Sequence, residues 1–338
     1  MKISFLLQNH TELIEQLGLD CATKVCRHFY KKLESDFDSL NSISKLSKQK
    51  ITESYLFDLP IIKEVHESSD ETVKFLLEFS DKKTAETVLI PFYKRYTACL
   101  STQIGCAMAC SFCYTGTQGL KRNLSADEIL GEYLVVWRWL KNNKPERSIA
   151  PNIVFMGQGE PLHNFDHVKK ATELFLDKKL IGLGPRQITL STAGYLPGLK
   201  RFHEFPQINL ALSLHSTNEE VRNELIPLNK AYHLDELFNV LDIVELKKRQ
   251  FITYEYLMIK NLNMFEEDVL GLVKNLKSRR AIINLIPFNP FPGSRYLRPS
   301  VSEIDTFKNS LVENGLHVMI RTTKGDSILA ACGQLTSK

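Results

Sequence analysis

The feature that most limits the fold is an alternation of strand-like and helix-like segments that begins at about residue 97. Strand-like runs are rich in branched and aromatic residues, and helical periodicity follows most of them. The expected strands are TACLSTQI, NIVFMG, RQITLS, INLALSL, FITYEYLMI, AIINLIPF and HVMIRT. Six βα units and a closing strand predict an α/β fold, a parallel sheet with helices outside it that forms a partial (β/α)6 barrel. Eight units would be needed to close a full barrel.

Helical patterns lie between most of these strands. They are SADEILGEYLVVWRWL, DHVKKATELFL, LDELFNVLDIVE, FEEDVLGLVKNL and EIDTFKNSLVEN. The first of them opens with Ser125 and, three residues later, Glu128, the spacing of a capping box.

Residues 1–80 have a different pattern and are predicted to form a small N-terminal helical accessory domain. The stretch VKFLLEFSDKKTAETVLIPFY alternates as a two-stranded hairpin does. Residues 81–338 are then the barrel, with extensions and a C-terminal cysteine segment.

Composition excludes several classes of protein. A length of 338 residues allows about two domains, and no apolar run approaches the ~18 residues of a membrane span. The opening MKISFLLQNHTELIEQ turns polar by Gln8, unlike a signal peptide. Seven cysteines in such a chain indicate reduced thiols, metal ligands or catalytic thiols, and a cytoplasmic location. The net charge of +4 is compatible with an RNA partner but also with an ordinary solvated surface.

Polar and glycine-rich signals follow the predicted strands. A three-cysteine loop follows the first strand and GQGEP the second; Ser191 ends the third, Ser213 and His215 end the fourth, and NPFPG follows the sixth. In a parallel barrel all of these positions fall on the C-terminal rim, where catalytic residues lie. The rim is therefore the predicted active site.

The three cysteines of that loop are Cys106, Cys110 and Cys113 in CAMACSFCYTG. They could be unrelated buried thiols, or part of a zinc site completed by a distant ligand, since structural zinc takes four ligands. A four-iron cluster normally takes four thiolates, so three would leave one iron open for another ligand. We favour the cluster.

A cysteine loop of this spacing after the first barrel strand resembles the radical S-adenosylmethionine superfamily. With CLSTQIGC, MGQGEP, LSTAG, SLH, INLIPFNPFPG and AACGQL, the chain resembles the RlmN/Cfr family of RNA adenine methyltransferases from about Glu86 to Leu335. The resemblance implies a [4Fe–4S] cluster on the three cysteines and S-adenosyl-L-methionine on the open iron.

The resemblance also assigns residues to the cofactor. Gly159 and Glu160 would hold the methionyl amine. Contacts to the carboxylate and ribose would come from Ser191, Ser213, Leu214, His215 and Asn289. Each of these could instead cap a strand end or form an ordinary turn.

Two remote cysteines and one glutamate would be catalytic. Cys332 resembles the thiol that is itself methylated, and Cys99 the thiol that later forms a disulfide with it. Glu86 resembles the base that takes the ring proton, although a lone strand Glu is usually solvated. Cys21 and Cys26 match nothing catalytic and are assigned to packing.

The implied reaction is methylation of C2 of an adenine in 23S rRNA, adenine-2503 in the family, and of adenine-37 in tRNA. It passes through a methylated cysteine and a covalent protein–RNA intermediate. The resemblance further implies a flavodoxin-type one-electron reductant, no membrane partner and a monomer. A basic group in the N-terminal helices is a candidate RNA surface, namely Lys24, Arg27, Lys31 and Lys32.

Alternatives remain open. A Cfr-like enzyme would methylate C8, and a non-catalytic iron–sulfur or zinc RNA-binding module would use neither Cys99 nor Cys332. GEPLHN and NPFPG favour the C2 enzymes, whereas PFYK before Arg95 replaces the acidic run usual there. Tyr114 and Gln158 also depart from the family pattern, which usually has a small residue and Met.

Overall fold

The computed structural model describes residues 2–322 and 324–336. Within them the main sheet has ten strands. Across the sheet these are β14 (Val318–Ile320), β13 (Ala281–Pro287), β12 (Ile252–Met258), β11 (Asn209–Ser213), β10 (Ile188–Thr192), β9 (Asn152–Phe155), β6 (Arg95–Cys99), β5 (Thr84–Phe92), β4 (Val73–Glu78) and β3 (Ile61–Glu67). Pairing is parallel from β6 to β14 and antiparallel from β3 to β6.

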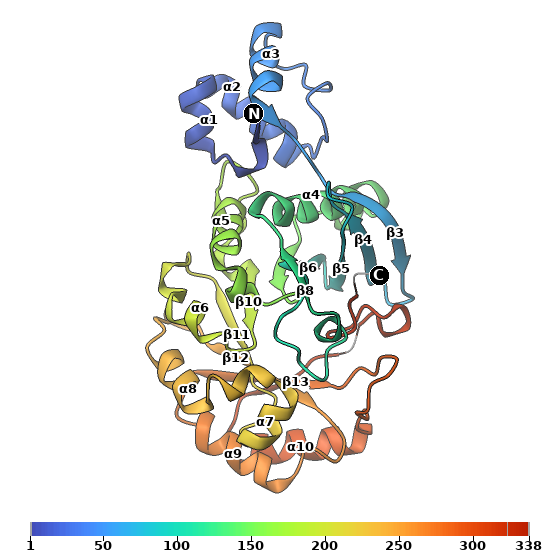
Figure 1. The fold of residues 1–338 in the computed structure, drawn as a ribbon, viewed down its shortest axis with the longest axis vertical. Coiled ribbons are helices and arrows are strands. Elements are labelled where there is room, and N and C mark those ends of the chain that lie inside the picture. The colour runs from blue at the N-terminus through green and yellow to red at the C-terminus, as the bar shows by residue number, and fades with distance from the viewer. Residues whose placement is uncertain (1, 323, 337–338) are drawn as a thin grey trace.

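The parallel part confirms the predicted α/β fold, six βα units with β14 as the closing strand. Helices cover the outside of the sheet (Figure 1). They are α4 (Ala126–Asn143), α5 (Phe165–Leu176), α6 (Leu196–Lys200), α7 (Glu219–Leu225), α8 (Leu234–Asp242), α9 (Glu266–Leu276) and α10 (Val301–Glu313). The sequence patterns did not include the short helices α6 and α7.

The first predicted strand, TACLSTQI, is wrong as a single element. β6 ends at Cys99, and the chain then leaves the main sheet to form β7 (Gln103–Gly105), which pairs antiparallel with β8 (Leu120–Asn123). Gly105 has φ +74° and lies so close to the Gly119 carbonyl that a Cβ would collide with it. This small hairpin frames the cysteine loop between its two strands.

An antiparallel extension joins the barrel to the N-terminal helices. β3 and β4 precede residue 80 yet pair with β5 in the main sheet, so the division of domains at that point stays a prediction. The helices before them, α1 (His10–Leu17), α2 (Leu19–Cys26) and α3 (Lys45–Ser54), gather at one end of the molecule (Figure 1). A short parallel pair closes this unit, β1 (Ile3–Ser4) with β2 (Tyr55–Leu56).

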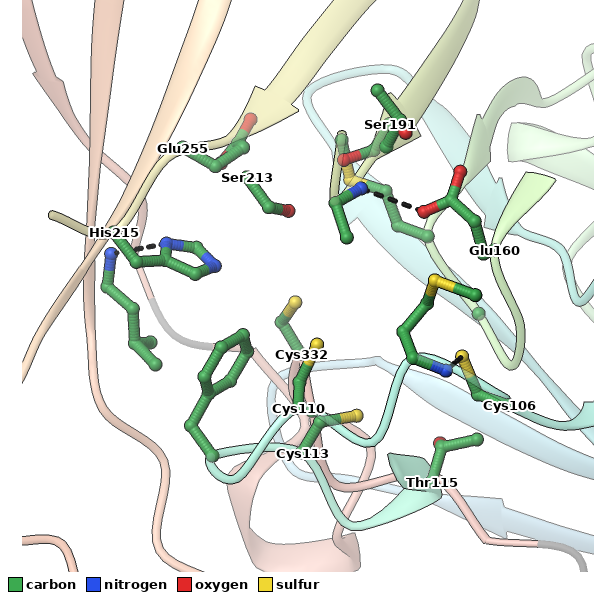
Figure 2. A pocket seen from close by; sticks show the side chains of 18 of the residues that line it. Cys106, Cys110, Cys113, Thr115, Glu160, Ser191, Ser213, His215, Glu255 and Cys332 are labelled. Carbon is green, nitrogen blue, oxygen red and sulfur yellow. Dashed lines mark hydrogen bonds between the residues drawn. The ribbon is translucent and has the colours of Figure 1, made fainter. Parts of the chain in front are cut away.

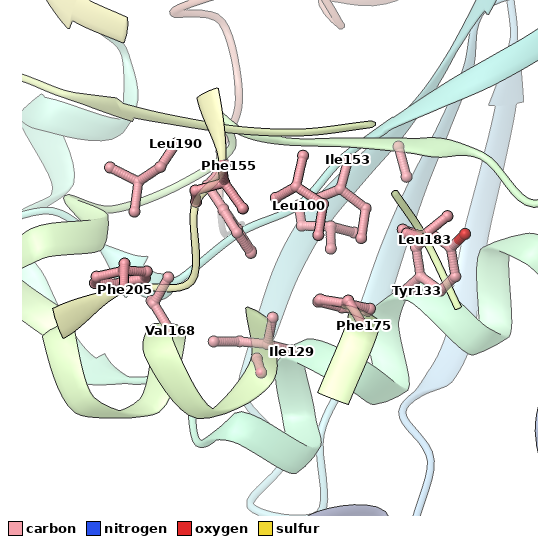
Figure 3. Close-up of a cluster of buried hydrophobic side chains, with 14 of the residues drawn as sticks. Leu100, Ile129, Tyr133, Ile153, Phe155, Val168, Phe175, Leu183, Leu190 and Phe205 are labelled. Atoms are coloured by element: carbon pink, nitrogen blue, oxygen red, sulfur yellow. The ribbon is translucent and has the colours of Figure 1, made fainter. Parts of the chain in front are cut away.

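The hydrophobic core lies between the sheet and its outer helices. Figure 3 shows Leu100, Ile153 and Phe155 facing side chains from α4 and α5, such as Ile129 and Phe175. The predicted capping interaction starts α4, because the Ser125 N–H donates to Oε2 of Glu128 at 2.9 Å. Burial of this apolar face is what fixes the strand ends in one rim.

Candidate active site

A cavity of about 990 Å³, including its part open to solvent, lies at the carboxyl ends of the parallel strands. Most residues predicted for the site line it: Cys106, Cys110, Cys113, Gly159, Glu160, Ser191, Ser213, His215 and Cys332. Figure 2 shows the side chains of these residues, Gly159 excepted, arranged around the opening. The structure thus brings together residues that are more than 200 positions apart in sequence.

The cysteine loop is held by one bond from outside and one within it. The Ser111 N–H donates to the Leu225 carbonyl at 3.0 Å, and the Gly116 N–H donates to the Cys113 carbonyl at 3.0 Å. Burial raises the pKa of the Cys106 thiol to about 12 and that of Cys113 above its usual value. These thiols would therefore become thiolates only with a strong cation beside them.

The donor chemistry of this loop fits an iron–sulfur cluster. Three soft thiolate ligands face one cavity. Among the residues that the structure describes, no three Cys, His, Asp or Glu side chains are close enough together to hold a single metal ion. A four-iron cluster places each thiolate on a different iron, so its cysteines need not meet at one point.

Glu160 presents a buried carboxylate at the end of β9. Its Oε1 accepts from the Leu162 N–H at 3.0 Å and its Oε2 from the Ala193 N–H at 2.8 Å. Burial raises the pKa of Glu160 to about 7, against the effect of these bonds. An ammonium group in the cavity would favour the charged form. Gly159 precedes it with φ +100°, where a Cβ would lie 2.5 Å from the Gln103 Cβ.

His215 leaves β11 with φ +58°, which turns its ring into the cavity. Its Nδ1 accepts from the Leu257 N–H at 3.1 Å, and its ring meets Phe112 edge-on at 4.6 Å. Burial, with the positive charge of Arg222, lowers the pKa of His215 to about 3. The imidazole is therefore neutral, and its Nε2–H is the ring's remaining donor.

Two predicted cofactor contacts do not line the cavity. Leu214 is fully buried, and its N–H donates to the Glu255 carbonyl at 3.0 Å. Asn289 is buried within NPFPG. A contact from either residue to the cofactor stays a prediction.

The C-terminal segment carries Cys332 into the cavity. The Tyr114 N–H donates to the Gly333 carbonyl at 2.7 Å, and the Thr115 hydroxyl donates to the Leu335 carbonyl at 2.8 Å. Cys332 is exposed, and it lines the cavity. Burial of its thiol within the cavity raises the pKa of that thiol. Hydrogen bonds to the cysteine loop therefore fix the thiol beside that loop.

Cys99 lies behind this segment at the end of β6. It packs in a small buried cluster with Val88, Ala330 and Leu335. Burial raises the pKa of Cys99 to about 12, with the Cys332 thiol adding to the effect and Arg321 opposing it. Cys99 thus packs against residues on both sides of Cys332 in the chain, and both cysteines are free thiols in the structure.

Glu86 is buried on β5 and is not among the residues that line the cavity. Its Oε1 pairs with Lys74 Nζ at 3.0 Å, and its Oε2 accepts from the Thr336 N–H at 2.7 Å. Burial raises the pKa of Glu86, and these two partners oppose that rise. Glu86 therefore contacts the same segment that carries Cys332.

Sequence reasoning missed three charged residues at the site. Glu255 and Arg321 line the cavity. Arg222, fully buried on α7, donates to the Ala193 carbonyl at 3.0 Å and to the Ser213 carbonyl at 3.2 Å. Arg222 thereby ties together the ends of β10 and β11. A charged residue in a helix normally faces solvent, so the sequence around Arg222 does not indicate that it is buried and joins two strand ends.

The predicted basic surface on the N-terminal helices is partly occupied. Lys24 pairs with Asp20 at 2.6 Å, and Lys31 donates to the Ile181 carbonyl at 3.0 Å. Arg27 and Lys32 are exposed. The described helices include none that is both long and apolar enough to cross a membrane.

The chain is similar to known proteins in both sequence and structure. Residues 100–273 match the Radical SAM superfamily. The chain is 41% identical over 324 residues to the dual-specificity RNA methyltransferase RlmN of Paramagnetospirillum magneticum, covering 94% of this chain and 71% of that protein. The crystal structure of a radical SAM methyltransferase from Sphaerobacter thermophilus aligns with TM-score 0.92 and 31% identity, over 99% of this chain and 100% of that one.

Proposed function

Because the chain belongs to the radical SAM superfamily and, within it, to the RlmN RNA methyltransferases, we propose that it methylates C2 of an adenine in 23S rRNA and of adenine-37 in tRNA. One observation carries the proposal. Cys332 lines the same cavity as the three cysteines of the 106–113 loop, and Cys99 packs against Ala330 and Leu335 of the segment that carries Cys332. This is the arrangement that a methyl-carrying thiol with a resolving partner requires.

The residues of the cavity suit both cofactors. Cys106, Cys110 and Cys113 would hold a [4Fe–4S] cluster, and Glu160 would pair with the amine of S-adenosylmethionine. The two serines at the strand ends, with His215, would bind its carboxylate and ribose. When bound, this pair supplies one-electron cleavage of the sulfonium and a hydrogen-abstracting carbon radical.

The side chains of the protein then have separate tasks. Cys332 accepts a methyl group as a thiolate and later presents its methylene carbon to the adenine. Glu86 takes the ring proton, and the unpaired electron of the adduct would leave to a one-electron acceptor, a role that the oxidised cluster would fill. Attack by the Cys99 thiolate on the sulfur of Cys332 forms the disulfide and breaks the sulfur–carbon bond. The carbon leaves with that electron pair and, once protonated, is the methyl group on the RNA.

Three further expectations accompany this function. An external one-electron reductant of the flavodoxin type would serve the cluster, the enzyme would act as a monomer, and it would work in the cytoplasm. The exposed Arg27 and Lys32 would contribute to an RNA-binding surface through phosphate contacts.

The test is to reconstitute the protein without oxygen and supply S-adenosylmethionine, a reductant and unmodified RNA. Nucleosides from the digested RNA are then separated beside standards of 2-methyladenosine and 8-methyladenosine. We expect the 2-methyl product from both a 23S rRNA fragment and tRNA. The 8-methyl product as the main species would assign the protein to the Cfr-like enzymes, and no methylation of either RNA would contradict the proposal.

A further inference from the structure

Arg321, a cation of the cavity wall, forms no ion pair with a described carboxylate, although the charge of Glu255 acts on it at longer range. Arg321 follows β14. Its backbone N–H donates to the Leu285 carbonyl at 2.8 Å, which fixes the backbone of Arg321 at the sheet. Its side chain lines the cavity together with Cys332 and Glu255. Across the described ranges, no carboxylate oxygen lies within 4.0 Å of the guanidinium.

Among the described residues, few of the donors of Arg321 have a partner. A guanidinium has five N–H donors, and within residues 2–322 and 324–336 the hydrogen bond of the Arg321 side chain is a weak one to Met156 Sδ at 3.5 Å. Arg222 is the contrast, because its donors are directed at the carbonyls of Ala193, Ser213 and Leu214. Arg222 holds the fold, whereas Arg321 directs free donors into a ligand cavity, where a bound acceptor would offset the cost of leaving them unpaired.

The neighbours of Arg321 indicate what kind of acceptor fits. It lines the same cavity as Cys332, and its charge counteracts the rise in the pKa of both the Cys332 and the Cys99 thiols that burial produces. A ligand held by Arg321 therefore lies beside the sulfur that delivers the carbon. Glu255 shares this wall, and its Oε2 accepts from Asn284 Nδ2 at 2.7 Å. An ionised Glu255 would repel a phosphate, but not the neutral edge of a base.

We propose that Arg321 is a catalytic residue that donates a hydrogen bond to a ring nitrogen of the target adenine next to the carbon that receives the methyl group. The inference rests on the proposed function and names the part of the substrate that this wall recognises. C2 lies between N1 and N3, which are both acceptors. A charged donor on either nitrogen withdraws electron density from C2 and orients that carbon toward Cys332.

The decisive experiment changes the RNA rather than the protein, so it does not depend on a variant folding. The wild-type enzyme is given RNAs with adenosine, 1-deazaadenosine, 3-deazaadenosine or 7-deazaadenosine at the target position. We expect the first-turnover rate to fall about 10- to 100-fold with either the 1-deaza or the 3-deaza RNA, the range for one specific base contact. The 7-deaza RNA is the matched control and should react normally, because N7 is not next to C2.

The same RNAs are then given to Arg321→Met and Arg321→Lys. Arg321→Met should react slowly with the adenosine RNA. Its rate should fall no further with the deaza RNA that slows the wild type, because the guanidinium that would contact the ring nitrogen is already absent. Arg321→Lys should recover part of the rate. Methylation of Cys332 without RNA, followed by intact mass, should continue in both variants, and the remote Arg280→Met should behave as wild type.

Three results would overturn the inference. Wild-type rates that are equal with 1-deaza, 3-deaza and ordinary RNA would show that Arg321 contacts neither nitrogen. A deaza penalty that persists undiminished in Arg321→Met would assign the contact to another residue. If Arg321→Met slows methylation of Cys332 as much as it slows methylation of the RNA, then Arg321 acts on the Cys332 thiol and not on the adenine. If the wild type fails with ordinary RNA, the proposed function itself is wrong and the inference falls with it.

Discussion

The backbone N–H of Thr336 donates a hydrogen bond of 2.7 Å to Oε2 of Glu86, a contact that joins positions 250 residues apart. It fastens the segment that carries Cys332 to a strand of the antiparallel extension. The carboxylate proposed to accept a proton from the RNA therefore also anchors the segment that carries the methyl group. A suitable substitution of Glu86 can test its proposed role as a base while keeping the hydrogen bond that anchors the segment.

Glu86→Gln keeps an oxygen that can accept from Thr336 but removes the basic carboxylate. We expect the radical addition to RNA to proceed and the later release to slow by about 10²- to 10⁴-fold, the usual contribution of a general base. Covalent protein–RNA adduct should accumulate on a denaturing gel. Glu78→Gln on the neighbouring strand is the control, and normal release by Glu86→Gln would assign the base to another residue.

Replacing Cys106, Cys110 or Cys113 with Ala should abolish the brown chromophore of anaerobically reconstituted protein. Reductive cleavage of S-adenosylmethionine should disappear with it, because the remaining two thiolates cannot hold the cluster in place. Absorption spectra and the yield of 5′-deoxyadenosine measure the two effects. Cys26→Ala serves as the control, since that buried thiol lies in the N-terminal helices. A colourless, zinc-loaded enzyme that stays active would refute the cluster.

Cys99 and Cys332 should fail in different ways. Cys332→Ala removes the methyl carrier, so no RNA adduct can form. Cys99→Ala leaves methylation of Cys332 and addition to the base intact but removes the nucleophile that releases the product. Protein expressed in cells should then carry bound RNA, seen as a ribonuclease-sensitive gel shift. The double variant should lose that shift, and RNA-free Cys99→Ala protein would show that Cys99 does not resolve the adduct.

His215 should make the fold sensitive to acid. The pKa of His215 is about 3 in the folded protein and about 6.5 for an ordinary histidine in the unfolded chain, so the unfolded chain binds the extra proton between these values. Its contribution is fully present above about pH 6.5 and is lost as the pH falls toward 3. At about 1.4 kcal/mol per pH unit, the loss reaches about 2 kcal/mol by pH 5. Urea unfolding of wild type and His215→Gln at pH 7.5 and pH 5 measures it, and equal losses in both would contradict it.

Arg222 should matter for stability and for the shape of the cavity. Arg222→Met leaves the carbonyls of Ala193 and Ser213 without their donor in a buried place. We expect the free energy of unfolding to fall by about 3 kcal/mol. Denaturant titration gives this value, with the exposed Arg295→Met as the matched control. A change below about 0.5 kcal/mol, typical of surface positions, would show that Arg222 is dispensable.

The sequence predicted the parts of the site that follow from strand periodicity. Once the parallel strands were placed, Ser191, Ser213 and His215 had to share one rim, because side chains that end parallel strands meet at one edge. The break after Cys99 was not predictable, since TACLSTQI alternates as one strand and the collision at Gly105 is visible only in three dimensions. Glu255 and Arg321 were missed for a similar reason. Each lies in an ordinary strand pattern, and its cavity forms from distant segments.

Cys332 lies beyond the last strand of the main sheet, and this order along the chain matters when the enzyme is made. When a ribosome has synthesised the chain as far as β14, every strand of the sheet and the whole cysteine loop already exist, but residue 332 does not. Because domains fold as they emerge, the barrel can take shape before its methyl acceptor arrives. If Cys332 acts as proposed, a product of interrupted synthesis would keep the cysteine loop yet be unable to alkylate any RNA, the ribosome that made it included.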